Sequence, residues 1–287
     1  MDHYKLANIT LQWDGGGFAL ARGRYMEQFR CTAAMSDEVI RFQSRFVPLE
    51  AYTRFPVVTE NSTYALFDIK GEPMIIYHWG NRRFAFAVWP ERITAEQVNE
   101  CWFDPDMQNQ PALNADWFFG VSGLHKALML HEAVVLHASY INRDGQAILF
   151  TGPSGTGKST QAELWEQYAG AEIINGDRAL LRRRGSVWHA FGYPCCGSSM
   201  ICQNRTLPLK AIVILEQAKE NRVESLSASQ KIRALVSGTE IYLWDTDEIN
   251  QAFHLAEQIS KEVPVIKLAC RPDKNAVTVL KEYLEVI

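Results

Sequence analysis

The chain has 287 residues, of which 47% are hydrophobic and 22% are charged, and its formal net charge is −4 with a sequence pI of about 6.0. A chain of this length forms one large domain or two, and we expect two. Because no broad basic surface is encoded, nucleic acid is not expected as the main partner. The apolar runs have only strand length and the first residues do not resemble a signal peptide, so we expect a cytoplasmic protein that neither spans nor binds a membrane.

The first part of the chain is expected to be a mostly antiparallel β domain of the α+β class. Ile9, Leu11 and Trp13 alternate with polar residues, which is the period of a half-buried strand. Three further runs at hairpin spacing predict a meander with strands at 64–69, 74–79 and 82–89.

A loop is predicted at 104–116, where prolines and asparagines occur with little periodicity. We place the domain boundary there, which gives a β-rich domain at 1–115 and a second domain at 116–287.

The second domain is predicted to begin with one helix that has Val121, Leu124 and Leu128 on one face. A strand at 134–141 follows, and the turn-forming residues 142–145 join it as a hairpin to a strand at 148–150. The later strand should therefore have an antiparallel neighbour, which predicts a mixed sheet.

The rest of the chain alternates between predicted strands and helices. Strands are expected at 172–175, 211–215, 241–244 and 263–269, and helices after 158, from about 227, at 249–259 and from 275. The helix at 249–259 should bury Ile249, Ala252, Phe253, Ala256 and Ile259, and Asp245 or Asp247 should cap its start.

A phosphate-binding loop follows the strand at 148–150. Gly152, four residues and then Gly157-Lys158-Ser159 have the Walker A spacing, with a helix after them. Glycines let backbone N–H groups turn toward phosphate oxygens, Lys158 should reach the β- and γ-phosphates, and Ser159 should offer its hydroxyl to Mg²⁺. The predicted ligands are ATP and Mg²⁺. The predicted nucleotide contacts in the loop are Gly152, Ser154, Gly155, Thr156, Gly157, Lys158, Ser159 and Thr160.

Segments around this loop resemble the HPr kinase/phosphorylase superfamily, and more closely its shorter relatives from peptide-modifying gene clusters. They are Leu136-His137-Ala138, with the histidine fifteen positions before Gly152, then Ile173-Ile174-Asn175-Gly176-Asp177-Arg178, and Cys270-Arg271-Pro272-Asp273. The resemblance implies a C-terminal P-loop kinase domain with the nucleotide-binding core shared with phosphoenolpyruvate carboxykinase. It also implies a nucleotide contact for Arg271. In the family this second segment ends in Asp-Asp-Arg. Here Gly176 stands in the place of the first of these two acids, and Asp177 in the place of the second.

The candidate catalytic residues are Lys158, Asp177 and His137. Asp177 ends an apolar strand 19 residues after Lys158, so it is expected to be a metal ligand beside Ser159. Glu216, which follows another apolar run, is the rival for this role. The proton of the acceptor hydroxyl is expected to pass to Asp177 or to His137.

Three further features are candidates for binding the acceptor or the transferring phosphoryl group. The loop 192–199 has small residues that suit acceptor binding, although an ordinary surface loop has the same composition. Arg205 and Arg271 are candidates for stabilising charge on a transferring phosphoryl group.

Three functions remain open at this point. The first is an ATP-dependent kinase that phosphorylates a hydroxyl, preferably a serine of a peptide or protein, and the second is a kinase for a small metabolite. The third is a non-catalytic ATP-binding module in which loss of the acid at Gly176 leaves binding without transfer. A homo-oligomer is compatible with each of them.

Overall fold

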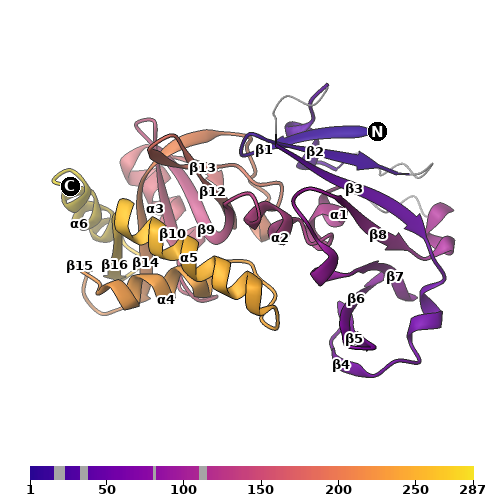
Figure 1. Ribbon diagram of the computed structural model, residues 1–287. Helices are drawn as coiled ribbons and strands as arrows, with labels where there is room; N and C mark the ends of the chain where they lie inside the picture. Colours follow the sequence, from indigo (N-terminus) through magenta and orange to yellow (C-terminus); the bar gives the residue numbers. More distant parts are fainter. Residues whose placement is uncertain (16–22, 33–37, 80–81, 110–114) are drawn as a thin grey trace. The chain divides into compact units, whose positions relative to one another are not determined.

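The computed structural model describes residues 1–15, 23–32, 38–79, 82–109 and 115–287, and it divides into two compact units, Met1–His131 and Glu132–Ile287 (Figure 1). Each unit is built around a large β-sheet, so the chain is mixed α/β with few helices. Within the described residues, no helix is long and apolar enough to cross a membrane. The predicted loop at 104–116 lies partly outside the described residues, at 110–114.

The sheet of the first unit has the strand order β1-β2-β3-β8-β7-β6-β5-β4. Its strands are β1 (Asp2–Leu6), β2 (Ile9–Asp14), β3 (Val39–Phe46), β4 (Val57–Glu60), β5 (Tyr64–Ile69), β6 (Glu72–Trp79), β7 (Arg82–Val88) and β8 (Val98–Phe103). The predicted meander is formed by the antiparallel strands β5, β6 and β7. Strand β3 pairs in parallel with both β2 and β8, so the sheet is mixed at its other end.

The division between the units comes after helices α1 (Ala115–Val121) and α2 (Leu124–Met129), later than the predicted boundary at 115/116. Phe118 of α1 packs 4.3 Å from the Trp13 ring and 5.9 Å from the Phe103 ring, between ring centroids. The Asp116 carboxylate accepts a hydrogen bond from the backbone N–H of Met26 at 2.7 Å. Helix α1 therefore belongs to the aromatic core of the first unit.

The single helix expected around 121–128 is two short helices. Gly123 lies between them with a φ of 77°, a left-handed conformation that ends one helix and starts the next. The prediction of one continuous helix was wrong because Gly123 permits this break.

The second unit has strands β9 (Ala133–Arg143), β10 (Gln146–Thr151), β11 (Glu172–Asn175), β12 (Arg178–Arg184), β13 (Val187–Phe191), β14 (Thr206–Gln217), β15 (Arg222–Glu224) and β16 (Val265–Cys270). Its helices are α3 (Lys158–Ala169), α4 (Ala228–Gly238), α5 (Thr246–Glu262) and α6 (Lys274–Leu284). The strand order is β10-β9-β12-β13-β14-β16-β15, with β11 also on β9 and a further pairing of β10 with β14.

Strand β10, which leads into the glycine-rich loop 152–157, lies between an antiparallel and a parallel neighbour. It pairs antiparallel with β9 and parallel with β14, as expected for the mixed sheet. The β9–β10 turn is tighter than the predicted four residues, because Arg143 pairs directly with Gln146. Asp144 and Gly145 form this two-residue turn with φ values of 52° and 80°, the positive angles that such hairpins need.

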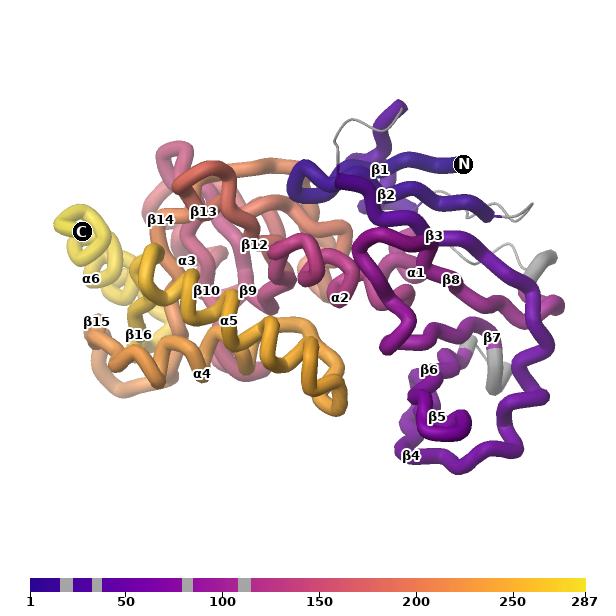
Figure 2. Tube along the Cα trace, in the orientation of Figure 1, coloured from indigo at the N-terminus to yellow at the C-terminus, as the bar shows by residue number. Residues whose placement is uncertain are grey.

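The two faces of the sheet are covered by different helices. Phe150 of β10 packs with Trp165 of α3 in a cluster that also contains residues of α6. The other face carries α4, whose Gly238 approaches Leu136 and Thr151 closely. Helices α4 and α5 contact each other and lie side by side in both views (Figures 1 and 2).

Two predictions for the segment before and within α5 were wrong. No strand forms at 241–244. The Tyr242 ring instead stacks on the Trp244 ring, and the backbone N–H of Tyr242 donates a hydrogen bond to the Glu248 carboxylate at 2.9 Å. The buried face of α5 includes Leu255 rather than Phe253, which is 47% exposed. The predicted N-cap was correct at Asp245, which accepts from the N–H of Glu248.

Candidate active site

Residues 152–157 form the loop between β10 and α3, and three glycines give it its shape. Gly152, Gly155 and Gly157 have φ values of 148°, 80° and 100°, which L-side chains rarely adopt. A Cβ at Gly152 would also lie 3.2 Å from the Leu215 carbonyl oxygen. Helix α3 begins at Lys158 without a side-chain cap, so the loop and the first turn together present unsatisfied N–H groups. This arrangement suits an anion such as a polyphosphate.

Lys158 is held against the loop. Its Nζ donates to the carbonyl oxygens of Gly152 at 3.0 Å and Pro153 at 3.2 Å. Burial lowers the pKa of this ammonium group, and the charge of Asp177 acts in the opposite direction. Ser159 and Thr160 are exposed on the first turn of α3, so their hydroxyl groups are accessible.

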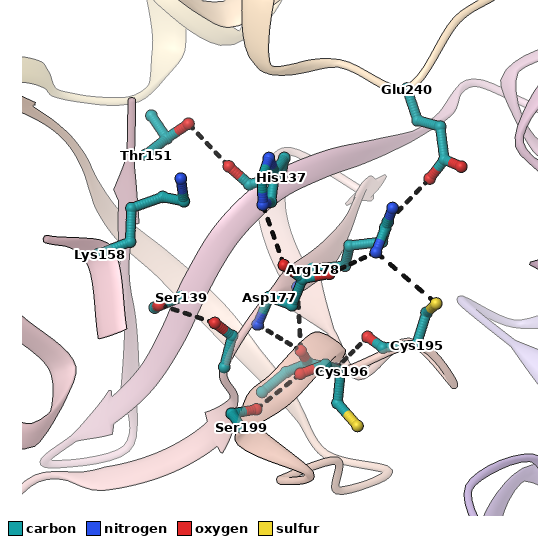
Figure 3. Close-up of polar contacts among 12 residues, drawn as sticks. His137, Ser139, Thr151, Lys158, Asp177, Arg178, Cys195, Cys196, Ser199 and Glu240 are labelled. Carbon is teal, nitrogen blue, oxygen red and sulfur yellow. Dashed lines mark hydrogen bonds and ion pairs between the residues drawn. The ribbon is translucent and has the colours of Figure 1, made fainter. Parts of the chain in front are cut away.

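His137 and Asp177 form a pair across two neighbouring strands. His137 is on β9, and Asp177 immediately precedes β12, whose first residue pairs with His137 in the sheet. The His137 Nε2 lies 2.9 Å from Asp177 Oδ1, and the two side chains are 43% and 22% exposed (Figure 3). The hydrogen bond from His137 lowers the pKa of Asp177, and the Arg178 charge adds to this effect although burial opposes it. The geometry thus gives a carboxylate-oriented imidazole beside Lys158.

Arg178 holds the other oxygen of Asp177. Its Nη1 pairs with Asp177 Oδ2, and its Nε donates to Glu240 at 3.0 Å. The Cys195 thiol lies 3.6 Å from the same Nη1. Burial alone would lower the pKa of Arg178, but Glu240, Cys195 and Asp177 together raise it, so the guanidinium remains charged.

The sequence analysis missed Asn175 as a positioning residue. Asn175 is fully buried, and its Oδ1 accepts from the N–H groups of both Asp177 and Arg178 at 2.9 Å. Its Nδ2 donates to the carbonyl oxygens of Tyr193 at 2.8 Å and Cys195 at 3.1 Å. The available signal was an Asn-Gly pair at the end of an apolar strand, which is typical of a turn built on the asparagine side chain.

The space beside Gly176 is filled by Ser199. A Cβ built on Gly176 would lie 2.2 Å from Ser199 Oγ, and this hydroxyl donates to the Cys196 carbonyl at 2.6 Å. Gly197 of the same loop packs against Asp177, where a Cβ would lie 2.9 Å from the carboxyl carbon. The loop 192–199 therefore lies directly against the candidate catalytic carboxylate, and an acid at position 176 would collide with it.

Two other charged residues that the sequence analysis considered for the site, Glu216 and Arg205, have partners outside the His137–Asp177 pair. Glu216, the rival of Asp177, pairs with Lys267 at 3.1 Å. Arg205 pairs with Glu172 at 3.9 Å. The structure thus brings His137, Asp177 and Arg178 into one network, which includes neither Glu216 nor Arg205.

Arg271 lies on the α3 side of the loop. It pairs with Asp273 at 2.9 Å and lines a space of about 390 Å³, together with Gly155, Thr156 and Thr160. We call this space the Arg271 hollow. A ligand with its phosphates at the glycines of the loop would therefore have room for its other groups in this hollow.

A larger space of about 500 Å³ lies on the opposite face of the sheet, between the loop residues 152–154 and helix α4. His137 and Ile214 line it, as do residues of α4. We call it the α4 pocket. The His137 side chain, which is 43% exposed, is thus part of the wall of this space.

The donor set for a metal ion is incomplete within the protein. Among the described residues, no group of three or more His, Cys, Asp or Glu side chains is placed to hold a metal. The Ser159 hydroxyl is accessible, but both oxygens of Asp177 already have partners. Ser159 therefore fits a Mg²⁺ ion that arrives with phosphate oxygens and water, whereas Asp177 fits only if one partner is displaced.

Comparison with known proteins gives a family match and likenesses to solved structures, of which one is described. A search of curated proteins gives no significant match. The structure of the Hpr(Ser) kinase/phosphatase from Coxiella burnetii aligns with 53% of this chain and 87% of that chain, at 14% identity and a TM-score of 0.30, values that carry no functional argument. The family described as SynChlorMet cassette protein ScmC matches residues 118–275, which is more than half of the chain. The chain therefore belongs to the SynChlorMet cassette protein ScmC family.

Proposed function

We propose that the second unit is an ATP-dependent phosphotransferase that transfers the γ-phosphate to a hydroxyl group, preferably that of a serine in a peptide or protein. The observation that carries this proposal is the position of the His137–Asp177 pair beside the loop that holds Lys158. Phosphoryl transfer needs the phosphates and the acceptor oxygen held in line, with a group that takes the acceptor proton. The preference for a peptide or protein serine rests on the motifs that resemble short HPr-kinase-related proteins.

The nucleotide is proposed to bind with its phosphates at the glycine loop and the start of α3. Lys158 would exchange the carbonyls of Gly152 and Pro153 for the β- and γ-phosphates, which are stronger acceptors for an ammonium group. The base and ribose would occupy the Arg271 hollow, because Thr160 and Arg271 lie there. Ser159 would hold Mg²⁺, which neutralises charge on the phosphates when bound.

His137 is proposed as the direct proton acceptor, and Asp177 as the group that orients it. When Nε2–H donates to Asp177, the lone pair of Nδ1 points away from this carboxylate, and the side chain is 43% exposed. The acceptor oxygen would bond to the γ-phosphorus as the bond to the β,γ-bridging oxygen breaks, ADP would leave, and the hydroxyl proton would pass to Nδ1. The Asp177 carboxylate would stabilise the imidazolium that forms. Direct proton transfer to Asp177 is the alternative.

The test is incubation with γ-labelled ATP and three sets of acceptors: serine peptides, small hydroxylated metabolites, and none. Label in serine peptides supports the proposal, and label only in metabolites would replace the peptide acceptor by a small one. ATP binding without transfer to any acceptor would contradict the enzyme activity and favour a nucleotide-binding module. His137→Gln is the matched variant, since it should bind ATP yet transfer slowly.

A further inference from the structure

The α4 pocket is bounded by one face of a helix. Its lining residues on α4 are Gln230, Arg233, Ala234, Ser237 and Gly238. Their spacing of three, four, seven and eight residues places them on one side of the helix. Ile214 and Pro153 complete the apolar part of the wall, and His137 lies at one boundary. The pocket therefore joins an apolar surface to the proposed proton acceptor.

The last residue of α4, Gly238, packs closely against strands β9 and β10 of the sheet. A Cβ on Gly238 would lie 3.0 Å from both Leu136 Cδ1 and Thr151 Oγ1. The side chain of Thr151 in turn donates to the His137 carbonyl at 2.9 Å. These contacts fix the position of α4 relative to the loop. The pocket between them is therefore defined by the packing of the fold.

Arg233 is the charged residue of the α4 pocket. Several other arginines of this unit are paired with carboxylates, for example Arg178 with Glu240 and Arg183 with Glu262. Arg233 is exposed, and among the described residues it makes no ion pair. An unneutralised guanidinium at an apolar pocket favours a ligand that carries both a carboxylate and an apolar group.

We propose that the α4 pocket binds the acceptor, as a peptide segment whose hydroxyl lies at His137, with an apolar side chain in the pocket and a carboxylate on Arg233. This inference rests on the proposed function, which it extends to the class of acceptor sequence. The alternative in which Arg233 contacts the nucleotide phosphates is an outcome of the test. In that case Arg233 would affect ATP binding rather than acceptor choice.

The experiment uses the full chain and fluorescein-labelled peptides with one central serine. Leucine or alanine flanks the serine, and glutamate, glutamine or lysine is placed at each position up to three residues away. Binding is measured by anisotropy, and transfer is measured in parallel with γ-labelled ATP. We expect the leucine and glutamate peptides to bind about tenfold more tightly than their alanine or glutamine counterparts, with KM following the same order.

Two substitutions and one control test the residues. Arg233→Glu should reverse the preference from glutamate to lysine peptides, and Ala234→Leu should weaken binding of the leucine peptides by filling the pocket. Lys231→Glu makes the same charge change on α4 at a residue outside the pocket lining, so it should leave the preference unchanged. ATP affinity should be the same in all of these proteins.

The outcomes separate the two proposals. Binding with the expected preference but without transfer contradicts the kinase activity and supports the pocket. Transfer without any charge or size preference contradicts the pocket and supports the kinase activity. A loss of ATP affinity in Arg233→Glu, or a reversal in Lys231→Glu, also contradicts the acceptor role of Arg233.

Discussion

Asp177 shares its two oxygens between His137 and Arg178, and this division defines what the residue can do. Oδ1 accepts from the imidazole and Oδ2 pairs with the guanidinium. A carboxylate held in this way orients and stabilises a charged imidazole better than it coordinates a metal ion. These contacts are the reason for proposing His137 as the proton acceptor and Asp177 as the group that supports it.

Replacing Asp177 by asparagine should retain most of the ATP affinity and reduce phosphoryl transfer roughly a hundredfold or more, because the negative charge opposite His137 is lost. Single-turnover kinetics and calorimetry measure the two effects. Glu216→Gln is the matched control, since Glu216 pairs with Lys267 instead. An inactive Glu216→Gln protein beside an active Asp177→Asn protein would reverse the assignment.

Replacing Lys158 by alanine should weaken binding of ATP-Mg²⁺ at least about tenfold, because no other lysine lies in the loop to offset the charge of the phosphates. Calorimetry measures the affinity directly. Lys261→Ala is a control, because Lys261 is on α5 and pairs with Glu257. Equal affinity of Lys158→Ala and the native protein would remove the phosphate-binding assignment.

The Asp177 network should make stability depend on pH in the acid range. Its folded-state pKa is lowered from the usual value of 3.8, mainly by the hydrogen bond from His137. A lowered carboxyl pKa stabilises the folded protein above the unfolded-state pKa, and this contribution disappears as the pH falls through the lower folded-state value. Asp177→Asn should therefore have a lower free energy of unfolding than the native protein near neutral pH, and the difference should shrink toward pH 3. Urea titrations across this range check the sign, and a constant difference would argue against the charge effect.

At the scale of elements, the loop 192–199 and the end of β11 are fitted to each other. Gly176→Ala should lower the free energy of unfolding by about 1–3 kcal/mol, because its Cβ would overlap Ser199 Oγ. The double variant Gly176→Ala, Ser199→Gly should recover part of this loss, and Ser199→Gly alone serves as the reference for the cycle. Additive effects in urea denaturation would show that the two residues are not in contact. Restoring the acid by Gly176→Asp alone is accordingly not expected to improve transfer.

Elements with strong local signals were predicted well. Alternation and turn residues located the β5–β7 meander, and the glycine loop with its following helix located β10 and α3. Helix α4 was expected from about 227, and its N-cap is Ser227, which forms a capping box with Gln230. The predicted strand at 241–244 does not form, because this apolar, largely aromatic run makes local contacts instead: Tyr242 stacks on Trp244 and bonds to Glu248 of α5.

For the whole molecule, the family match covers residues 118–275, which includes the last part of α1, all of α2 and most of the second unit. The proposed chemistry and the proposed acceptor pocket both lie in the second unit alone. The first unit has its own aromatic core around Phe118 and Trp13. The predicted boundary at 115/116 lies earlier in the chain than the division between the two units of the structure. The sequence alone does not show to which unit Phe118 belongs, because a buried helical phenylalanine can pack in either core.

The sequence by itself determined the features that depend on near neighbours in the chain. The spacing of Gly152, Gly157 and Lys158 is sufficient to predict a glycine-shaped loop before a helix, because the loop conformation is set by the glycines themselves. The tertiary structure decided the contacts between distant segments: His137 with Asp177, Asn175 with the 193–195 backbone, and Ser199 in the space beside Gly176. The same holds for the α4 pocket, where residues 137, 152–154 and 230–238 meet. Such contacts depend on strand pairing and helix packing, which no local pattern of residues specifies.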